Sequence, residues 1–169
     1  MSAALLDAMD EADARAALTR CCGAARWVEG MLARRPFGDD AALHCAADEV
    51  WAAMGRSDVL EAFSHHPRIG ADIDALRARF GSKGDLQWSS GEQAGLSEAD
   101  EDTLRALRDG NLAYEERFGF IFIVCASGKS AAEMLALLRS RLHNDPDDEL
   151  RIAAAEQAKI THLRLEKLA

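Results

Sequence analysis

The segment from Ser64 to Gly70, Ser-His-His-Pro-Arg-Ile-Gly, places two histidines directly before a proline. An imidazole has an ordinary pKa of about 6.5 and can both give and take a proton near neutral pH. Because the residue before a proline disfavours helix, a helix that carries Val59 and Phe63 must stop at about His65. His66 is then held at a helix exit, and His65 is the more exposed of the two. The same pattern also fits a helix-terminating turn without a chemical role.

A second segment, Trp88 to Leu96, places Ser89 three residues before Glu92, with Gln93 beside the carboxylate. This Ser-x-x-Glu spacing is typical of a capping box that opens a helix. A carboxylate next to a carboxamide could equally orient a histidine or bind the amide of a ring. The spacing leaves both interpretations open.

Arg164 falls on a helix expected for the end of the chain, about 40° around the axis from Ile160. It therefore lies close to the apolar stripe of Leu150, Ala153, Gln157 and Ile160. A basic side chain there needs a partner, which is either an internal carboxylate or the anion of a ligand. A guanidinium group suits bidentate binding of a carboxylate.

The other histidines and the cysteines predict no metal site. Cys21, Cys22, Cys45 and Cys125 form no Cys-x-x-Cys pair, so we expect free thiols in a reducing compartment, packed as small buried residues. His162 is expected on a solvated helix face. The sequence has no Gly-rich phosphate loop and no Gly-x-Ser-x-Gly motif, and we expect neither a metal nor a cofactor.

Helices are expected after the capping residues Asp10, Asp39 or Asp40, Ser57 or Asp58, and Ser130, from Pro146 to about Leu168, and over Glu98–Arg117. The stretch from Gly70 to Gly95 is the least regular, with a weakly helical piece over 72–80. The run Phe-Ile-Phe-Ile-Val-Cys that begins at Phe120 has the composition of a strand but no second run to pair with. Its buried backbone groups must then meet helix ends, water or a polar ligand. The sequence predicts an all-α fold, a single-domain helical bundle over 1–169 with one extended segment near residues 120–126.

The composition limits the partners. Against 29 Asp and Glu stand 20 Lys and Arg, for a formal charge of −9, which disfavours nucleic acid and anionic membranes. The N-terminus turns acidic before any apolar run could form a signal peptide or a membrane span. The last residues are not a peroxisomal Ser-Lys-Leu signal. We expect a cytoplasmic protein.

Four segments in order resemble one family. They are His65–Gly70, the run Ser89-x-x-Glu92-Gln93-Ala-Gly95, the run Tyr114–Phe120 continuing through Cys125-Ala126, and Lys159-Ile-x-x-Leu-Arg-Leu165; Arg35-Pro36-Phe37 fits as well. Together they are similar to the 2-oxo-4-hydroxy-4-carboxy-5-ureidoimidazoline (OHCU) decarboxylases of urate degradation, of the bacterial type. The resemblance implies an all-helical, cofactor-free, usually homodimeric enzyme. Such an enzyme converts its small-molecule substrate, OHCU, to (S)-allantoin and CO2.

The resemblance also implies roles for single residues. By motif, the catalytic residues correspond to His66, Glu92 and Arg164. The substrate-binding residues correspond to Pro67, Ser89, Gln93, Ile123, Val124 and Cys125, and the backbone of the last three matches the stretch that lines the ring pocket. In this hypothesis Arg164 binds an oxygen of the substrate and His66 relays protons. Glu92 would raise the pKa of His66.

Two other functions compete with this interpretation. A histidine phosphotransfer module is also small, acidic and helical, but it exposes its histidine in mid-helix, which the proline after His66 opposes. A non-catalytic helical binding or dimerisation domain would keep the pocket without the chemistry. Substitution of His66 would then change affinity alone.

Overall fold

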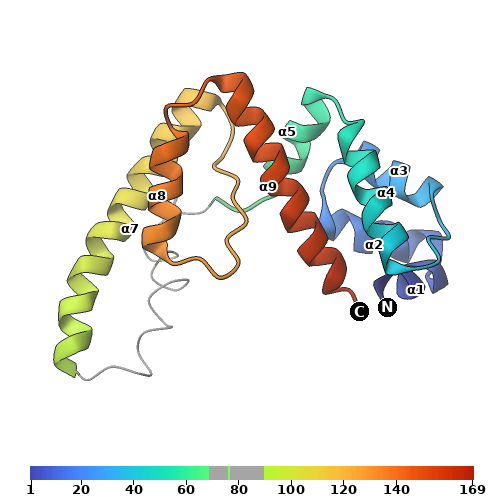
Figure 1. Ribbon diagram of the computed structural model, residues 1–169, viewed down its shortest axis with the longest axis horizontal. Helices are drawn as coiled ribbons and strands as arrows, with labels where there is room; N and C mark the ends of the chain where they lie inside the picture. The colour runs from blue at the N-terminus through green and yellow to red at the C-terminus, as the bar shows by residue number, and fades with distance from the viewer. Residues whose placement is uncertain (69–75, 77–89) are drawn as a thin grey trace. The chain divides into compact units, whose positions relative to one another are not determined.

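The computed structural model describes residues 1–68, 76 and 90–169 of the chain, with side chains described from residue 101 onward in the last range. Within these ranges the chain forms eight helices and no strand (Figure 1). The helices are α1 (Ser2–Ala8), α2 (Glu11–Cys21), α3 (Ala25–Ala33), α4 (Asp40–Ala52), α5 (Arg56–Ser64), α7 (Ser90–Phe118), α8 (Ala131–Arg141) and α9 (Pro146–Glu166). The predicted all-α fold class is confirmed.

Side-chain caps start three of the helices. The side chains of Asp10, Asp39 and Ser130 each accept the backbone N–H three residues on, at 2.8, 2.7 and 3.1 Å, and so satisfy donors that a first turn leaves unpaired. For α5 the predicted cap is wrong, because the N-cap is Gly55. The Asp58 carboxylate accepts the Gly55 N–H at 3.1 Å instead.

The boundaries differ from expectation at two further places. The short helix α1 was not expected; it buries Ala3 and Leu6, which are 1% and 0% exposed. The long helix α7 begins at Ser90 rather than at Glu98. The helical piece expected over 72–80 lies outside the described residues, Leu76 apart. In the described part of the chain, no helix has the length and apolar character needed to cross a bilayer.

The described chain divides into two compact units. The first consists of Met1–His66 and Ile152–Ala169, and the second of Pro67–Arg151. Helix α9 runs from the second unit into the first. The single domain expected over 1–169 stays a prediction.

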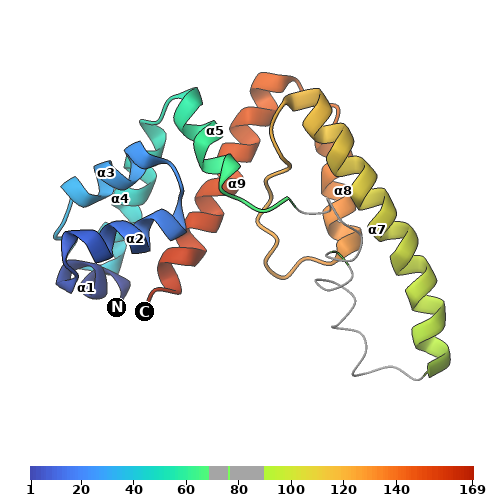
Figure 2. The same cartoon turned by 180° about the vertical axis from the view of Figure 1, so that it is seen from behind.

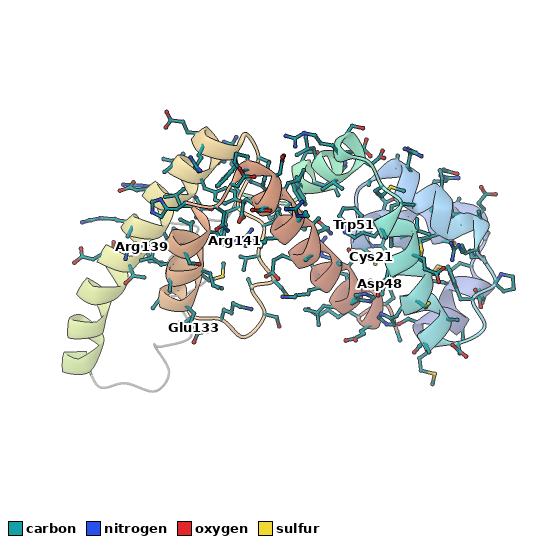
Figure 3. The ribbon with its side chains drawn as sticks, turned by 45° about the horizontal axis from the view of Figure 1, so that its top comes forward. Cys21, Asp48, Trp51, Glu133, Arg139 and Arg141 are labelled. Atoms are coloured by element: carbon teal, nitrogen blue, oxygen red, sulfur yellow. The ribbon has the colours of Figure 1, made fainter. Side chains whose placement is uncertain are left out.

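In the first unit, helices α1 to α5 and the C-terminal part of α9 enclose one apolar core (Figure 2). Trp27 of α3 is fully buried and donates its indole N–H to the Ala47 carbonyl at 3.2 Å. Trp51 of α4, labelled in Figure 3, donates its indole N–H to the Ala154 carbonyl at 3.0 Å. These bonds tie α4 to α3 on one side and to α9 on the other.

In the second unit, α7 and α8 lie side by side in both views of the ribbon. Gly110 permits this approach, because a Cβ there would stand 2.7 Å from a methyl group of Leu138. After α7 the chain turns at Gly119 (φ 80°), runs without regular structure and turns again at Gly128 (φ 74°). The extended segment expected near 120–126 is confirmed, and it forms no sheet among the described residues.

Candidate active site

His66 lies directly after the C-terminal end of α5, and contacts with the start of α3 fix this end. The Glu61 carboxylate accepts the Ala25 N–H at 2.5 Å. Gly23 packs so closely on the ring of His65 that a Cβ at Gly23 would collide with it. His65 is exposed and His66 is half-buried, as the sequence predicts. The local fold therefore sets the position of the imidazole of His66.

The partner of His66 is a carboxamide. Nε2 of the ring lies 2.5 Å from Oε1 of Gln157 on α9. Burial holds the pKa of His66 below its usual value; the hydrogen bond to Gln157 opposes this effect, and the positive charges of Arg164 and His65 add to it. The direction is opposite to the one expected from Glu92, whose side chain lies outside the described residues.

Arg164 is half-buried on α9 and points to the C-terminal end of α2. Its Nη1 donates to the Arg20 carbonyl at 3.3 Å, one of the carbonyls that the last turn of a helix leaves unpaired. No carboxylate pairs with Arg164 among the residues that the structure describes. Within that part of the chain, the internal carboxylate partner that the sequence left open is absent.

Two buried thiols share this environment. Cys21 and Cys22 are each 1% exposed, and burial raises the pKa of each to about 11, although Arg164 lowers both. They are therefore neutral packing residues at physiological pH, as the sequence predicts. All four cysteines are free thiols, but Cys45 is exposed and not buried as expected.

The structure thus brings His66 and Arg164 together and joins Gln157 to them. Ile123, Val124 and Cys125 are buried in the second unit, at 2%, 3% and 8% exposure. Pro67 is exposed. Ser89 lies outside the described residues. Glu92 and Gln93 fall within α7, but their side chains are not among those described.

The extended segment finds polar partners within its own unit. Nη1 of Arg141, which is labelled at the end of α8 in Figure 3, donates to the Ile123 carbonyl at 2.7 Å. The same side chain pairs with Glu149 at 2.9 Å, and Glu149 accepts from the Tyr114 hydroxyl at 2.9 Å. Lys129 donates to the Cys125 carbonyl at 2.7 Å. The partners of these two carbonyls are therefore side chains, and not the helix ends, water or ligand expected from the sequence.

His162 is not a solvated residue, contrary to the prediction. It is half-buried, its Nδ1 lies 2.5 Å from Nδ1 of His44, and its Nε2 lies 2.6 Å from the Asp48 carboxylate. The two rings stack and hold α9 against α4. In the described ranges, no group of three or more His, Cys, Asp or Glu could hold a metal ion.

Sequence reasoning missed Gln157 as part of the site, since it placed this residue on an apolar stripe. The available signal was a polar pair four residues apart on that stripe, Gln157 and Thr161. Both are buried, at 0% and 5% exposure. Polar side chains at such positions must bond to each other or to a neighbouring element.

The described helices place a half-buried histidine within the electrostatic influence of an arginine, an arrangement that suits proton transfer next to a bound anion. The family model described as OHCU decarboxylase matches residues 7–166, and the chain belongs to this family. It is 38% identical over 149 residues to the uric acid degradation bifunctional protein TTL of Arabidopsis thaliana, covering 88% of this chain and 45% of that protein.

Two further relatives match more of their own length. One is the 2-oxo-4-hydroxy-4-carboxy-5-ureidoimidazoline decarboxylase of Amia calva, 40% identical over 138 residues, with 79% of this chain and 74% of that protein covered. The other is a crystal structure of OHCU decarboxylase in the presence of (S)-allantoin. It has a TM-score of 0.69 and 36% identity, and the match covers 89% of this chain and 94% of that one. By contrast, the chain spans less than half the length of the Arabidopsis relative.

Proposed function

We propose that the protein decarboxylates OHCU to (S)-allantoin and CO2 in urate degradation, without a cofactor. The observation that carries this proposal is a half-buried His66 that is hydrogen-bonded to Gln157 and lies within the electrostatic influence of Arg164. Membership of the OHCU decarboxylase family supports it. The relatives named above carry the same activity, or uric acid degradation, in their descriptions.

The reaction needs an anion site and a proton relay. The substrate carries a carboxylate and a hydroxyl on one ring carbon. Loss of CO2 sends the electron pair of the broken C–C bond into the adjacent ring system. The hydroxyl loses its proton and becomes a carbonyl, and the neighbouring carbon gains a proton on one face. The ring system that receives the electron pair also takes up one proton from solvent, so the net change from the carboxylate is the loss of CO2 and the gain of one proton.

The residues have distinct roles in this scheme. Arg164 binds an anionic or carbonyl oxygen of the substrate and supplies the local positive charge that a chain of net charge −9 lacks overall. His66 takes the hydroxyl proton and returns a proton to the carbon, a role worth about 10²–10⁴ in rate. Glu92 is the third catalytic residue. Pro67, Ser89, Gln93 and the backbone of Ile123, Val124 and Cys125 bind the ring.

The proposal is tested by following the chirality of allantoin by circular dichroism. Urate oxidase and hydroxyisourate hydrolase generate the substrate, and the wild type is compared with His66→Ala and Glu92→Gln. We expect rapid formation of (S)-allantoin from the wild type only. Racemic allantoin at the same slow rate with and without the folded protein would refute the proposal and favour a non-catalytic binding domain. Phosphoryl transfer to His66 from a phosphorylated response regulator would favour a phosphotransfer module.

The setting of the enzyme is also part of the proposal. We place it in the cytoplasm as a homodimer with one domain over residues 1–169, and with neither nucleic acid nor membrane as a partner. The net charge of −9 supports the last point. Light scattering coupled to gel filtration measures the mass in solution, and a monomer at assay concentration would rule out the dimer.

A further inference from the structure

Gln157 makes a chain of hydrogen bonds that begins at the ring of His66. Its side chain is 0% exposed. Oε1 lies 2.5 Å from Nε2 of His66, and the amide Nε2 donates to Oγ1 of Thr161 at 3.0 Å. The Thr161 hydroxyl lies 3.0 Å from the main-chain carbonyl of Gln157. A fully buried carboxamide is thus held at both of its polar ends.

The donors and acceptors in this series of hydrogen bonds determine which atom donates at each step. Main-chain carbonyls can only accept, so the Thr161 hydroxyl gives its one hydrogen to the Gln157 carbonyl or to the Cys21 carbonyl, which lies 3.5 Å away, and accepts from the Gln157 amide nitrogen. The amide oxygen must then face His66. Because a carboxamide oxygen also only accepts, the hydrogen between the two side chains belongs to Nε2 of His66. In the neutral ring, Nδ1 is left without a hydrogen.

We infer that Gln157, held by Thr161, is a positioning residue that fixes His66 as the Nε2–H tautomer and leaves Nδ1 as the atom that accepts the substrate proton. The inference rests on the proposed function for the chemistry at Nδ1, but the tautomer itself follows from the hydrogen bonds. Without the carboxamide, a neutral imidazole divides between two tautomers, of which one has no basic Nδ1.

A carboxamide suits this task better than a carboxylate would. A carboxylate at the same place would stabilise imidazolium and raise the pKa of His66, so the ring would hold its proton at neutral pH. The amide orients the ring without adding a charge. Among the residues whose side chains are described, the charged or titratable groups that act on His66 are Arg164 from α9 and His65, which directly follows α5. Both favour the neutral ring, which is the form that can act as a base.

The tautomer is measured directly by NMR on the full chain labelled with ¹⁵N-histidine. Above neutral pH, the two ring nitrogens of His66 have chemical shifts that identify which one carries the hydrogen. We expect Nε2–H in the wild type and a mixture in Gln157→Leu. A wild-type ring with its hydrogen on Nδ1 overturns the inference. This measurement needs no substrate, so it stands even if no (S)-allantoin is formed.

The kinetic test uses two substitutions of Gln157: glutamate keeps the shape of the side chain, and leucine removes its polar atoms. Gln157→Glu should move the acid limb of kcat/KM to higher pH, whereas Gln157→Leu should lower kcat by about 10–100-fold, part of the contribution of general acid–base catalysis. A merely structural role would lower stability and leave the pH profile unchanged. An unchanged profile in a folded Gln157→Glu variant therefore contradicts the inference.

Thr161 offers a matched pair in case the Gln157 variants do not fold. Thr161→Ser keeps the hydroxyl that orients the amide, and Thr161→Val removes it at nearly constant volume. We expect the wild-type tautomer and kcat with serine. With valine the amide can turn, so the Nε2–H signal should weaken and kcat should fall by a few-fold or more. Equal tautomer populations in the two variants would count against the inference.

Discussion

Arg141 donates to the Ile123 carbonyl at 2.7 Å while its guanidinium pairs with Glu149. The two charged side chains are 7% and 0% exposed, so the ion pair lies inside the second unit. A main-chain carbonyl outside any helix is thereby fixed by the end of α8 and the start of α9. Ile123 and the two residues after it are among those for which the family resemblance implies substrate binding.

The first prediction concerns the removal of one partner of this ion pair. Arg141→Met leaves the Glu149 carboxylate buried without its countercharge, which costs about 3–5 kcal/mol in the free energy of unfolding. Urea denaturation measures the loss. Arg139→Met is the matched control, because Arg139 is exposed on the same helix, and its effect should stay within about 0.5 kcal/mol. Equal midpoints for the two variants would contradict the buried role of Arg141.

Much of the fold could be predicted from local patterns. The caps at Asp10, Asp39 and Ser130 each follow from a few neighbouring residues. The extended segment after α7 was also predictable, because its strand-like composition has no second run to pair with. The caps depend on contacts within about one helical turn, whereas the extended segment was inferred by comparing its composition with the rest of the chain.

The site was predictable only in part. The proline after His66 indicates the end of α5, but that an amide on α9 would meet the ring depends on contacts 91 residues apart. The ion pair of Arg141 with Glu149 was not predictable either, because it joins two different helices, α8 and α9, across the turn between them. For His162 the predicted solvated face was wrong, because its contact with His44, 118 residues away, cannot be inferred from local spacing.

The second prediction concerns the close approach of Gly23 to His65. In Gly23→Ala the new methyl group collides with the imidazole, which displaces the end of α5 and with it His66. We expect a loss of about 1–3 kcal/mol in stability, as for other overpacked sites, together with a fall in kcat. Gly55→Ala at the other end of α5 is the control, since a Cβ there makes only ordinary contacts. Wild-type kcat in Gly23→Ala would show that the position of His65 does not determine that of His66.

The third prediction tests whether Arg164 binds the substrate by bidentate hydrogen bonds from its planar guanidinium group or only through its positive charge. Arg164→Lys keeps the charge but loses bidentate binding, so kcat/KM should fall by about tenfold or more, with most of the change in KM. Arg20→Lys is the control, because the Arg20 side chain is exposed in the last turn of α2, and its kcat/KM should equal that of the wild type. If Arg164→Lys also left kcat/KM unchanged, bidentate recognition of the substrate would be excluded.

The fourth prediction concerns pH. Because burial holds the pKa of His66 below its usual 6.5, the neutral base persists to lower pH than in a free imidazole. The acid limb of kcat/KM should therefore have its midpoint below 6.5, with a plateau through neutrality. The sign for stability follows from linkage: below 6.5 the unfolded chain binds a proton at His66 that the native state resists, so the free energy of unfolding decreases as the pH falls. His66→Gln should remove this part of the decrease in urea titrations at several pH values. An acid limb with a midpoint above 6.5 would instead mean that a carboxylate outside the described residues, such as that of Glu92, controls the ring.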